Sequence, residues 1–229
     1  MSSPFAHPIG CLLWDVDGTL TDTTSLIVDA LDFIYRKHFG RTLPHDALRA
    51  LIGTPLREQI RVFGDPEALG ASSESLTEDF IARYEQQKAR ERILDPVVSV
   101  LIEGARRGLP TALVTSKNRV ELGNTLPRLG IGNCVGFIVT ADDVRNPKPN
   151  PEGLIKALQY FGTDPIAAVF IGDTVHDMRA ARAAGVSGVA VTWGAGTRSV
   201  LEAEAPAVIC DTPQQLCTAL FADNMSLPI

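Results

Sequence analysis

The chain has 229 residues, of which 45% are hydrophobic, and a formal net charge of −6. This length suits one large domain, or a core with a smaller insert, that buries its own apolar core. The acidic balance argues against nucleic acid as a partner, and no apolar run approaches the roughly 18 residues of a membrane span.

The first predicted element is a buried strand that ends in carboxylates. An apolar run forms the strand Leu12–Asp15, and Asp17, Gly18 and Thr19 follow. Asp is disfavoured in strands, and strand side chains alternate, so we expect Asp15 and Asp17 to point the same way. Their charges repel unless a divalent cation or a shared proton neutralises them. An Asp-rich turn with a helix cap is the alternative.

The next segment, residues 24–92, lacks convincing strand runs. Its apolar residues recur at helical spacing, notably in Leu26–Ile34 and Leu76–Tyr84, and Gly and Pro mark the turns between them. The segment is too long for a simple crossover connection. We expect a module of four or five helices, inserted after the first strand and placed above the carboxyl end of that strand.

From residue 95 onward, strand-like runs alternate with helix-like segments. The strand-like runs are Thr111–Thr115, Gly136–Thr140, Ala167–Ile171, Gly188–Thr192 and Ala207–Cys210. Pro follows Asp95, Asn150 and Thr212, which is typical of helix starts. The alternation predicts an α/β fold with a parallel sheet, crossover helices and an active site at the carboxyl ends of the strands.

Polar residues follow three of the later strands. They are Thr115-Ser116-Lys117-Asn118, Asn146-Pro147-Lys148 and Gly172-Asp173-Thr174-Val175-His176-Asp177. Singly, Thr115 or Asp173 would cap a helix, and Lys148 would be a solvated loop charge. Asp177 would be an exposed acid in a first helical turn. Together they bring hydroxyl, amine and carboxylate groups to one edge of the sheet.

This order of residues resembles the haloacid dehalogenase superfamily of phosphotransferases. The matching motifs are Asp15-Val16-Asp17-Gly18-Thr19-Leu20, Thr115, Lys148 and Gly172-Asp173-Thr174-Val175-His176-Asp177. Nearly the whole chain is covered, and Thr115-Ser116-Lys117 looks closest to the phosphoglycolate phosphatase-like branch. The resemblance implies a Rossmann-like core of residues 9–22 and 93–225, with a helical cap of residues 23–92.

The resemblance also implies roles for the charged residues. Asp15 would be the nucleophile that forms an aspartyl-phosphate, and Asp17 the acid that protonates the leaving alkoxide and later activates water. Lys148 would offset the charge of Asp15 and hold the phosphate. The metal expected is Mg²⁺, because its ligands would be oxygen atoms. These ligands would be Asp15, Asp173 and the carbonyl oxygen of Asp17. Asp177 would either act through a water molecule or orient Lys148.

Substrate contacts are expected from a second set of residues. Thr115, Ser116 and the following amides would bind phosphate oxygens at a helix N-terminus. Gly18 permits close backbone approach to the phosphate. Lys117 either touches the substrate or belongs to a helix cap. Arg57 is the candidate partner for a substrate carboxylate, with an exposed surface arginine as the alternative. The loop of residues 193–196 is expected to be a packed turn.

These expectations predict a Mg²⁺-dependent phosphatase that hydrolyses a small, phosphoglycolate-like phosphate monoester. A phosphomutase acting on a sugar phosphate, a pyrophosphatase and a catalytically idle regulatory protein of the same fold are the alternatives. The four cysteines are Cys11, Cys134, Cys210 and Cys217, and their scatter favours reduced thiols and a cytoplasmic location. The apolar start lacks the basic flank of a secretory signal. A monomer or a homodimer is expected.

Overall fold

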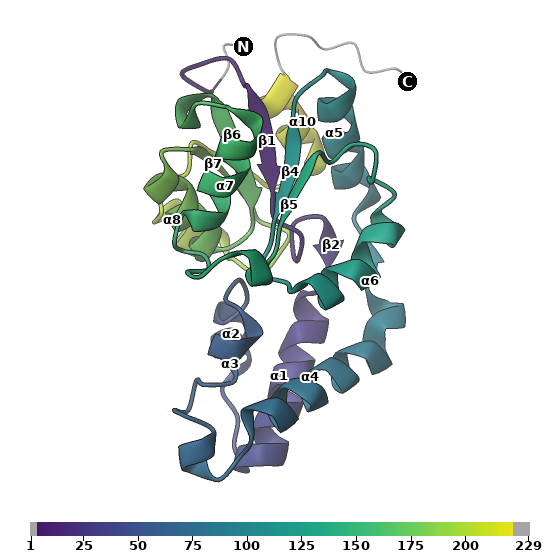
Figure 1. Ribbon diagram of the computed structural model, residues 1–229, viewed down its shortest axis with the longest axis vertical. Helices are drawn as coiled ribbons and strands as arrows, with labels where there is room; N and C mark the ends of the chain where they lie inside the picture. The colour runs from purple at the N-terminus through teal and green to yellow at the C-terminus, as the bar shows by residue number, and fades with distance from the viewer. Residues whose placement is uncertain (1–3, 222–229) are drawn as a thin grey trace.

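A six-stranded parallel sheet forms the centre of the protein (Figure 1). The structure, a computed structural model, describes residues 4–221. The strands are β1 Cys11–Trp14, β4 Thr111–Val114, β5 Phe137–Val139, β6 Ala168–Gly172, β7 Ser187–Val191 and β8 Val208–Cys210. Their order in the sheet is β5-β4-β1-β6-β7-β8. The predicted α/β fold with a parallel sheet is therefore confirmed.

Strand β1 lies inside the sheet, between β4 and β6. Leu13 is in register with Ala112 of β4 and with Phe170 of β6. All four residues of β1 are buried, because both faces of a parallel sheet are covered by helices. The side chains alternate: Leu12 and Trp14 join one core cluster, whereas Cys11 and Leu13 join the other.

Helices cover both faces of this sheet (Figure 1). They are α5 Asp95–Arg106, α6 Arg119–Leu129, α7 Glu152–Phe161, α8 Val175–Ala184, α9 Arg198–Glu202 and α10 Pro213–Phe221, with the short 3₁₀ turns η3 Ala141–Asp143 and η4 Pro165–Ala167. Residues of α5 and α10 pack in the cluster of Leu12, and residues of α7 and α8 pack in the cluster of Leu13. The prolines that follow Asp95, Asn150 and Thr212 mark helix starts to within one residue, since α5, α7 and α10 begin at Asp95, Glu152 and Pro213.

A helical module lies below the carboxyl ends of the strands in the view of Figure 1. Its elements are α1 Thr24–Phe39, α2 His45–Ala50, α3 Leu56–Gln59, η1 Glu67–Leu69, α4 Ser73–Gln87 and η2 Lys88–Arg90. It has its own apolar core, to which Leu31, Ile34 and Leu76 contribute. The helical periodicity predicted for Leu26–Ile34 and Leu76–Tyr84 is confirmed by α1 and α4.

Two short strands connect the module to the sheet. β2 Thr21–Asp22 pairs antiparallel with β3 Arg92–Ile93, so the chain enters and leaves the module through one ribbon. Asp22 accepts a hydrogen bond from Arg92 at 2.5 Å across this ribbon. The division into a core of residues 9–22 and 93–225 and a cap of residues 23–92 stays a prediction, and residues 222–225 lie outside the described part of the chain.

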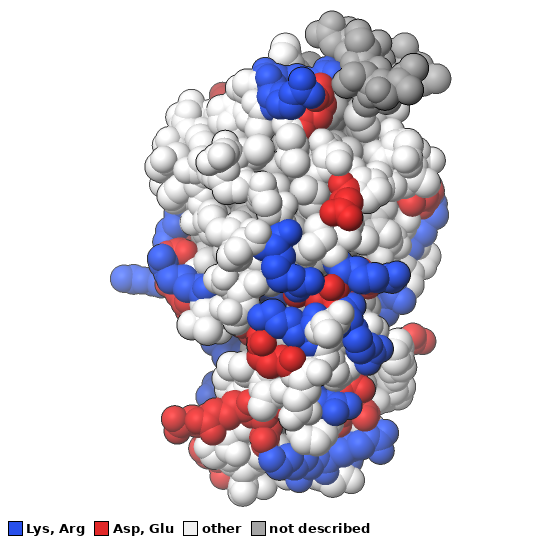
Figure 2. All heavy atoms as spheres, turned by 90° about the vertical axis from the view of Figure 1, so that its right-hand side faces the viewer, with Lys and Arg blue, Asp and Glu red and all other residues white. Residues whose placement is uncertain are grey.

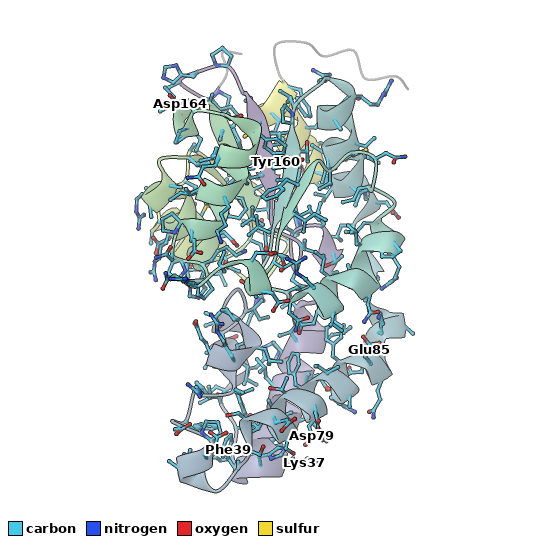
Figure 3. The ribbon with its side chains drawn as sticks, viewed as in Figure 1. Lys37, Phe39, Asp79, Glu85, Tyr160 and Asp164 are labelled. Atoms are coloured by element: carbon cyan, nitrogen blue, oxygen red, sulfur yellow. The ribbon has the colours of Figure 1, made fainter. Side chains whose placement is uncertain are left out.

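Charged side chains are unevenly distributed on the face that Figure 2 shows. Lys, Arg, Asp and Glu gather over the middle and the lower part, and the upper part is mostly uncharged. Lys37 of α1 and Asp79 of α4 form an ion pair of 2.6 Å near the lower end of the module (Figure 3). Within residues 4–221, no helix combines the length and apolarity that crossing a membrane requires.

Candidate active site

A buried lysine lies between two carboxylates at the carboxyl edge of the sheet. Lys148 Nζ donates to Asp15 Oδ1 and to Asp177 Oδ1, at 2.7 Å in each case. The N–H of Asp15 bonds to the carbonyl of Ile171 at 2.9 Å, so the sheet holds the backbone beyond β1. Burial alone would lower the pKa of Lys148, but the charges of Asp15 and Asp177 outweigh it and raise that pKa. Lys148 therefore keeps its positive charge.

Asp177 is held in place by the start of α8. The hydroxyl and the N–H of Thr174, the residue before α8, donate to Asp177 Oδ2 at 2.6 and 2.9 Å. This reciprocal capping box leaves Asp177 fully buried, so the exposed first-turn acid of the alternative interpretation is wrong. A Cβ at Gly172 would lie 2.5 Å from the Cβ of Asp177, so close packing requires glycine there.

Asp173 is enclosed by two loops from different parts of the chain. Thr19 Oγ1 donates to Asp173 Oδ1 at 3.0 Å, and the N–H of Ala195 donates to Oδ2 at 2.6 Å. A Cβ at Gly18 or Gly194 would collide with the carboxylate of Asp173. Asp173 is thus not the helix cap. The loop of residues 193–196 is packed as expected, but it packs directly on Asp173.

Three buried carboxylates come together here. One oxygen each from Asp15, Asp173 and Asp177 lies within 4.8 Å of the others, so the three residues could hold a metal ion. Burial raises the pKa of Asp15 to about 7, although Lys148 opposes the shift. Burial, together with the charges of Asp15 and Asp177, also raises the pKa of Asp173. One lysine does not balance three carboxylates, and an oxygen-binding divalent cation fits the remaining charge.

The side chain of Asp17 is held apart from these carboxylates. Its Oδ2 forms an ion pair of 2.8 Å with Lys117, and its Oδ1 accepts from the hydroxyl of Thr23 at 2.8 Å. Lys117 is buried and lies 5.2 Å from the centre of the Tyr84 ring. The structure thus joins Lys117 to the predicted acid–base residue.

The residues that follow β4, Thr115 to Asn118, contact both the core and the module. Thr115 is buried, and its Oγ1 accepts from the N–H of Lys117 at 3.2 Å. Ser116 Oγ donates to the carbonyl of Gly53 at 2.7 Å, which links the core to the helical module. Asn118, rather than Thr115, caps α6, since its side chain accepts from the N–H of Glu121 at 2.9 Å.

A cavity of about 90 Å³ lies between the module and this edge of the sheet. This volume is several times the roughly 10–15 Å³ that one water molecule needs. The core side chains lining it are Asp15, Asp17, Thr115, Ser116, Lys117, Val120, Glu121, Asn124 and Thr125. The module contributes Ile27, Ile52, Gly53, Thr54, Leu56, Gln59, Phe80, Ile81, Tyr84, Glu85 and Lys88.

Arg57 lies elsewhere. Its side chain is exposed and lines a separate groove with Glu58, Arg61 and Glu74. The exposed surface arginine, which was the alternative for Arg57, describes this position better than a contact with the substrate.

Several contacts of the site were not predicted from the sequence. Thr19 belongs to the first motif, but its bond to Asp173 was not expected, and Thr23, which binds Asp17, has no distinctive local pattern. Arg49 of α2 donates to the carbonyls of Gly194 and Ala195 at 2.5 and 2.6 Å. The module is therefore hydrogen-bonded to the loop that packs on Asp173. The exception is Thr174, because Thr-x-x-Asp before a helix is a spacing that predicts a capping box.

We expect Lys148→Met to destabilise the protein by about 3–5 kcal/mol in a metal-free buffer, because it leaves buried carboxylates without their cation. The midpoint of urea unfolding measures this. Lys156→Met is the matched control: Lys156 pairs with Glu152 at 3.1 Å with 40% of its side chain exposed, and such pairs contribute about 1 kcal/mol or less. Equal losses in the two variants would contradict the role of Lys148.

Comparisons with known proteins agree with this geometry. Residues 12–191 match the family model of haloacid dehalogenase-like hydrolases. The chain is 33% identical over 219 residues to the probable phosphatase IndB of Dickeya dadantii, covering 92% of this chain and 93% of that protein. It is 30% identical over 225 residues to the pyrophosphatase PpaX of Bacillus cereus, covering 95% and 99% of the two chains.

Solved structures show the same fold. A hydrolase from Pseudomonas syringae superposes with a TM-score of 0.82 at 25% identity, covering 94% of this chain and 100% of that one. The family model spans most of the chain and includes Asp15, Thr115, Lys148 and Asp173. The chain therefore belongs to the haloacid dehalogenase-like hydrolase family.

Proposed function

We propose that this chain, a phosphatase of the family, hydrolyses a small organic phosphate monoester through an aspartyl-phosphate on Asp15. The observation that carries the proposal is the buried contact of Lys148 with both Asp15 and Asp177, beside Asp173 and next to the cavity. Phosphoryl transfer depends mainly on positioning and on neutralising charge. This cluster supplies the positioning, and with a divalent cation bound it would also neutralise charge.

In the proposed reaction a carboxylate oxygen of Asp15 attacks the phosphorus atom, and the bond to the leaving alkoxide breaks. Asp17 gives the alkoxide a proton, so an alcohol leaves. Asp17 then takes a proton from a water molecule whose oxygen attacks the phosphorus. The bond to Asp15 breaks, and inorganic phosphate and the free carboxylate remain.

The remaining residues hold charge and position. Lys148 favours the ionised form of Asp15 against the effect of burial and balances the arriving phosphate. Thr115 and the following backbone amides are the proposed phosphate contacts. The carboxylates of Asp15, Asp173 and Asp177, with the carbonyl of Asp17, would hold Mg²⁺ directly or through water. Such an ion, when bound, would neutralise negative charge on the phosphoryl oxygens.

The alternatives remain testable beside this proposal. A mutase would return the phosphoryl group to a sugar phosphate, and a pyrophosphatase would release two phosphates from one substrate. The similarity to PpaX supports including pyrophosphate among the substrates tested. An idle regulatory protein would not need the buried set of Asp15, Lys148 and Asp173, so we do not favour it.

The test is a panel of phosphate monoesters, a sugar phosphate and pyrophosphate, assayed with and without a chelator. We expect phosphate release from monoesters with Mg²⁺ present and at least a roughly 100-fold lower rate after metal removal, because the buried carboxylates would then repel the substrate. The control is to add Mg²⁺ back, which should restore the rate of phosphate release. Full turnover in the chelator, or sugar-phosphate isomers without phosphate release, would contradict the proposal.

A further inference from the structure

Among residues 4–221, four buried side-chain atoms of the helical module have no hydrogen-bond partner, and two of the four lie at the cavity. These two are Oε1 of Gln59 and the hydroxyl oxygen of Tyr84. Both residues line the cavity that Asp15 and Asp17 also line. Leaving a buried polar atom unpaired costs free energy, and in native proteins most such atoms are paired. These two atoms therefore point to a ligand that enters the cavity.

The chain itself determines which atom Gln59 offers. Its Nε2 donates to the carbonyl oxygen of Thr54 at 2.8 Å. A carbonyl oxygen can only accept, so the nitrogen must face Thr54 and the unpaired atom is an acceptor. The backbone carbonyl of Gln59 accepts from the hydroxyl of Tyr35 at 2.6 Å, and the residue is only 6% exposed. Gln59 thus presents a fixed acceptor.

The loop before Gln59 is docked on the core. Ser116 Oγ donates to the carbonyl of Gly53 at 2.7 Å, and a Cβ at Gly53 would lie 2.8 Å from Thr174 Oγ1. Thr174 also binds Asp177 of the carboxylate cluster. Gln59 Oε1 is therefore held on the module side of the cavity, and the core side of the same cavity carries Asp15 and Asp17.

The charges around the cavity disfavour a second anion on the substrate. Both lysines that line it are already paired: Lys117 with Asp17 at 2.8 Å, and Lys88 with Glu85 at 3.1 Å. Glu85, which lies where α4 approaches the core (Figure 3), and Glu121 line the same cavity. A carboxylate or a second phosphate on the leaving group would meet these acids and no unpaired cation among the lining residues.

Most of the remaining module wall is apolar. The apolar side chains are Ile27, Ile52, Leu56, Phe80 and Ile81. Such a wall removes the carbon skeleton of a ligand from water, and a few fixed polar atoms then select among ligands of the same shape.

We infer that the leaving group of the substrate is a neutral alcohol with a hydroxyl or N–H donor of its own. That donor binds Gln59 Oε1, the hydroxyl of Tyr84 makes a second contact, and the carbon skeleton packs on the apolar wall. The inference rests on the proposed phosphatase function. It selects neutral sugar-like esters over phosphoglycolate and pyrophosphate.

A matched pair of substrates tests this assignment. Ribose 5-phosphate and tetrahydrofurfuryl phosphate share a five-membered ring, but only the first carries ring hydroxyls. We expect the wild-type ratio of their kcat/KM values to favour ribose 5-phosphate, with phosphoglycolate slower still. Tyr84→Phe and Gln59→Met should each lower that ratio at least about fivefold, because each removes one hydrogen bond to the substrate.

Tyr84→Phe is the cleaner variant, since the hydroxyl that it deletes has no partner among the residues that the structure describes. Tyr160→Phe is the matched control, because Tyr160 is 59% exposed on α7 and lies outside the cavity (Figure 3). If esters are hydrolysed, two results overturn the inference. One is a ratio of the two kcat/KM values that is unchanged in both test variants, and the other is a wild-type preference for phosphoglycolate. No turnover of any ester instead defeats the proposed function, and the inference with it.

Discussion

Replacing Asp15 with Asn is expected to lower kcat for p-nitrophenyl phosphate by at least about 10³-fold, because the amide oxygen is a far weaker nucleophile than a carboxylate. The substitution keeps the shape of the side chain, and Lys148 keeps its bond of 2.7 Å to Asp177. The fold should therefore persist, and the loss should be one of chemistry. Steady-state release of nitrophenolate measures it.

The matched control is Asp46→Asn on the exposed surface of α2, whose side chain is fully accessible to solvent. It should leave kcat unchanged, and both variants should unfold in the same cooperative transition as the wild type. Turnover by Asp15→Asn within tenfold of the wild type would show that another residue attacks the phosphorus.

Asp17→Asn is expected to lower kcat by roughly 10²–10⁴-fold, the usual contribution of a general acid–base residue. The effect should depend on the leaving group. Nitrophenolate leaves without protonation, so the first step should survive with p-nitrophenyl phosphate, whereas the attack by water should be slow. We expect a rapid burst of about one nitrophenolate per active site, followed by slow turnover.

An alkyl phosphate provides the comparison for this variant. Its alkoxide needs a proton, so the first step itself should be slow and no burst of alcohol should appear. Equal slowing of both steps with both esters would contradict the role of Asp17 in proton transfer. Lys117→Met separates proton transfer from positioning, because it removes the ion pair of 2.8 Å but keeps the carboxylate.

Much of the fold could be predicted from the sequence because each element carries its own pattern. The buried strands are short apolar runs, and their alternation with helices is typical of a parallel sheet. Parallel strands then bring their carboxyl ends to one edge, which is why Asp15, Lys148 and Asp173 could be expected together. β2 and β3 were missed because two residues are too few to show a period.

Contacts that depend on docking could not be predicted in the same way. Arg49 reaches the carbonyl of Ala195, 146 residues away, and nothing near Arg49 indicates that partner. Arg57 directly follows Leu56, which lines the cavity, yet the side chain of Arg57 lines another groove. The sequence around Gln59 does not indicate a ligand contact, because a glutamine on a short helix is common. Only the bond to Thr54 reveals which of its atoms is free.

The central claim is that Asp15 carries the phosphoryl group during turnover. Asp17→Asn, mixed with p-nitrophenyl phosphate and quenched during the burst, should hold the group as an acyl phosphate. Borohydride reduces an acyl phosphate to an alcohol, so peptide mass spectrometry should find homoserine in place of Asp15. Reduction at another residue, or an unmodified Asp15 in the presence of a full burst, would contradict the account.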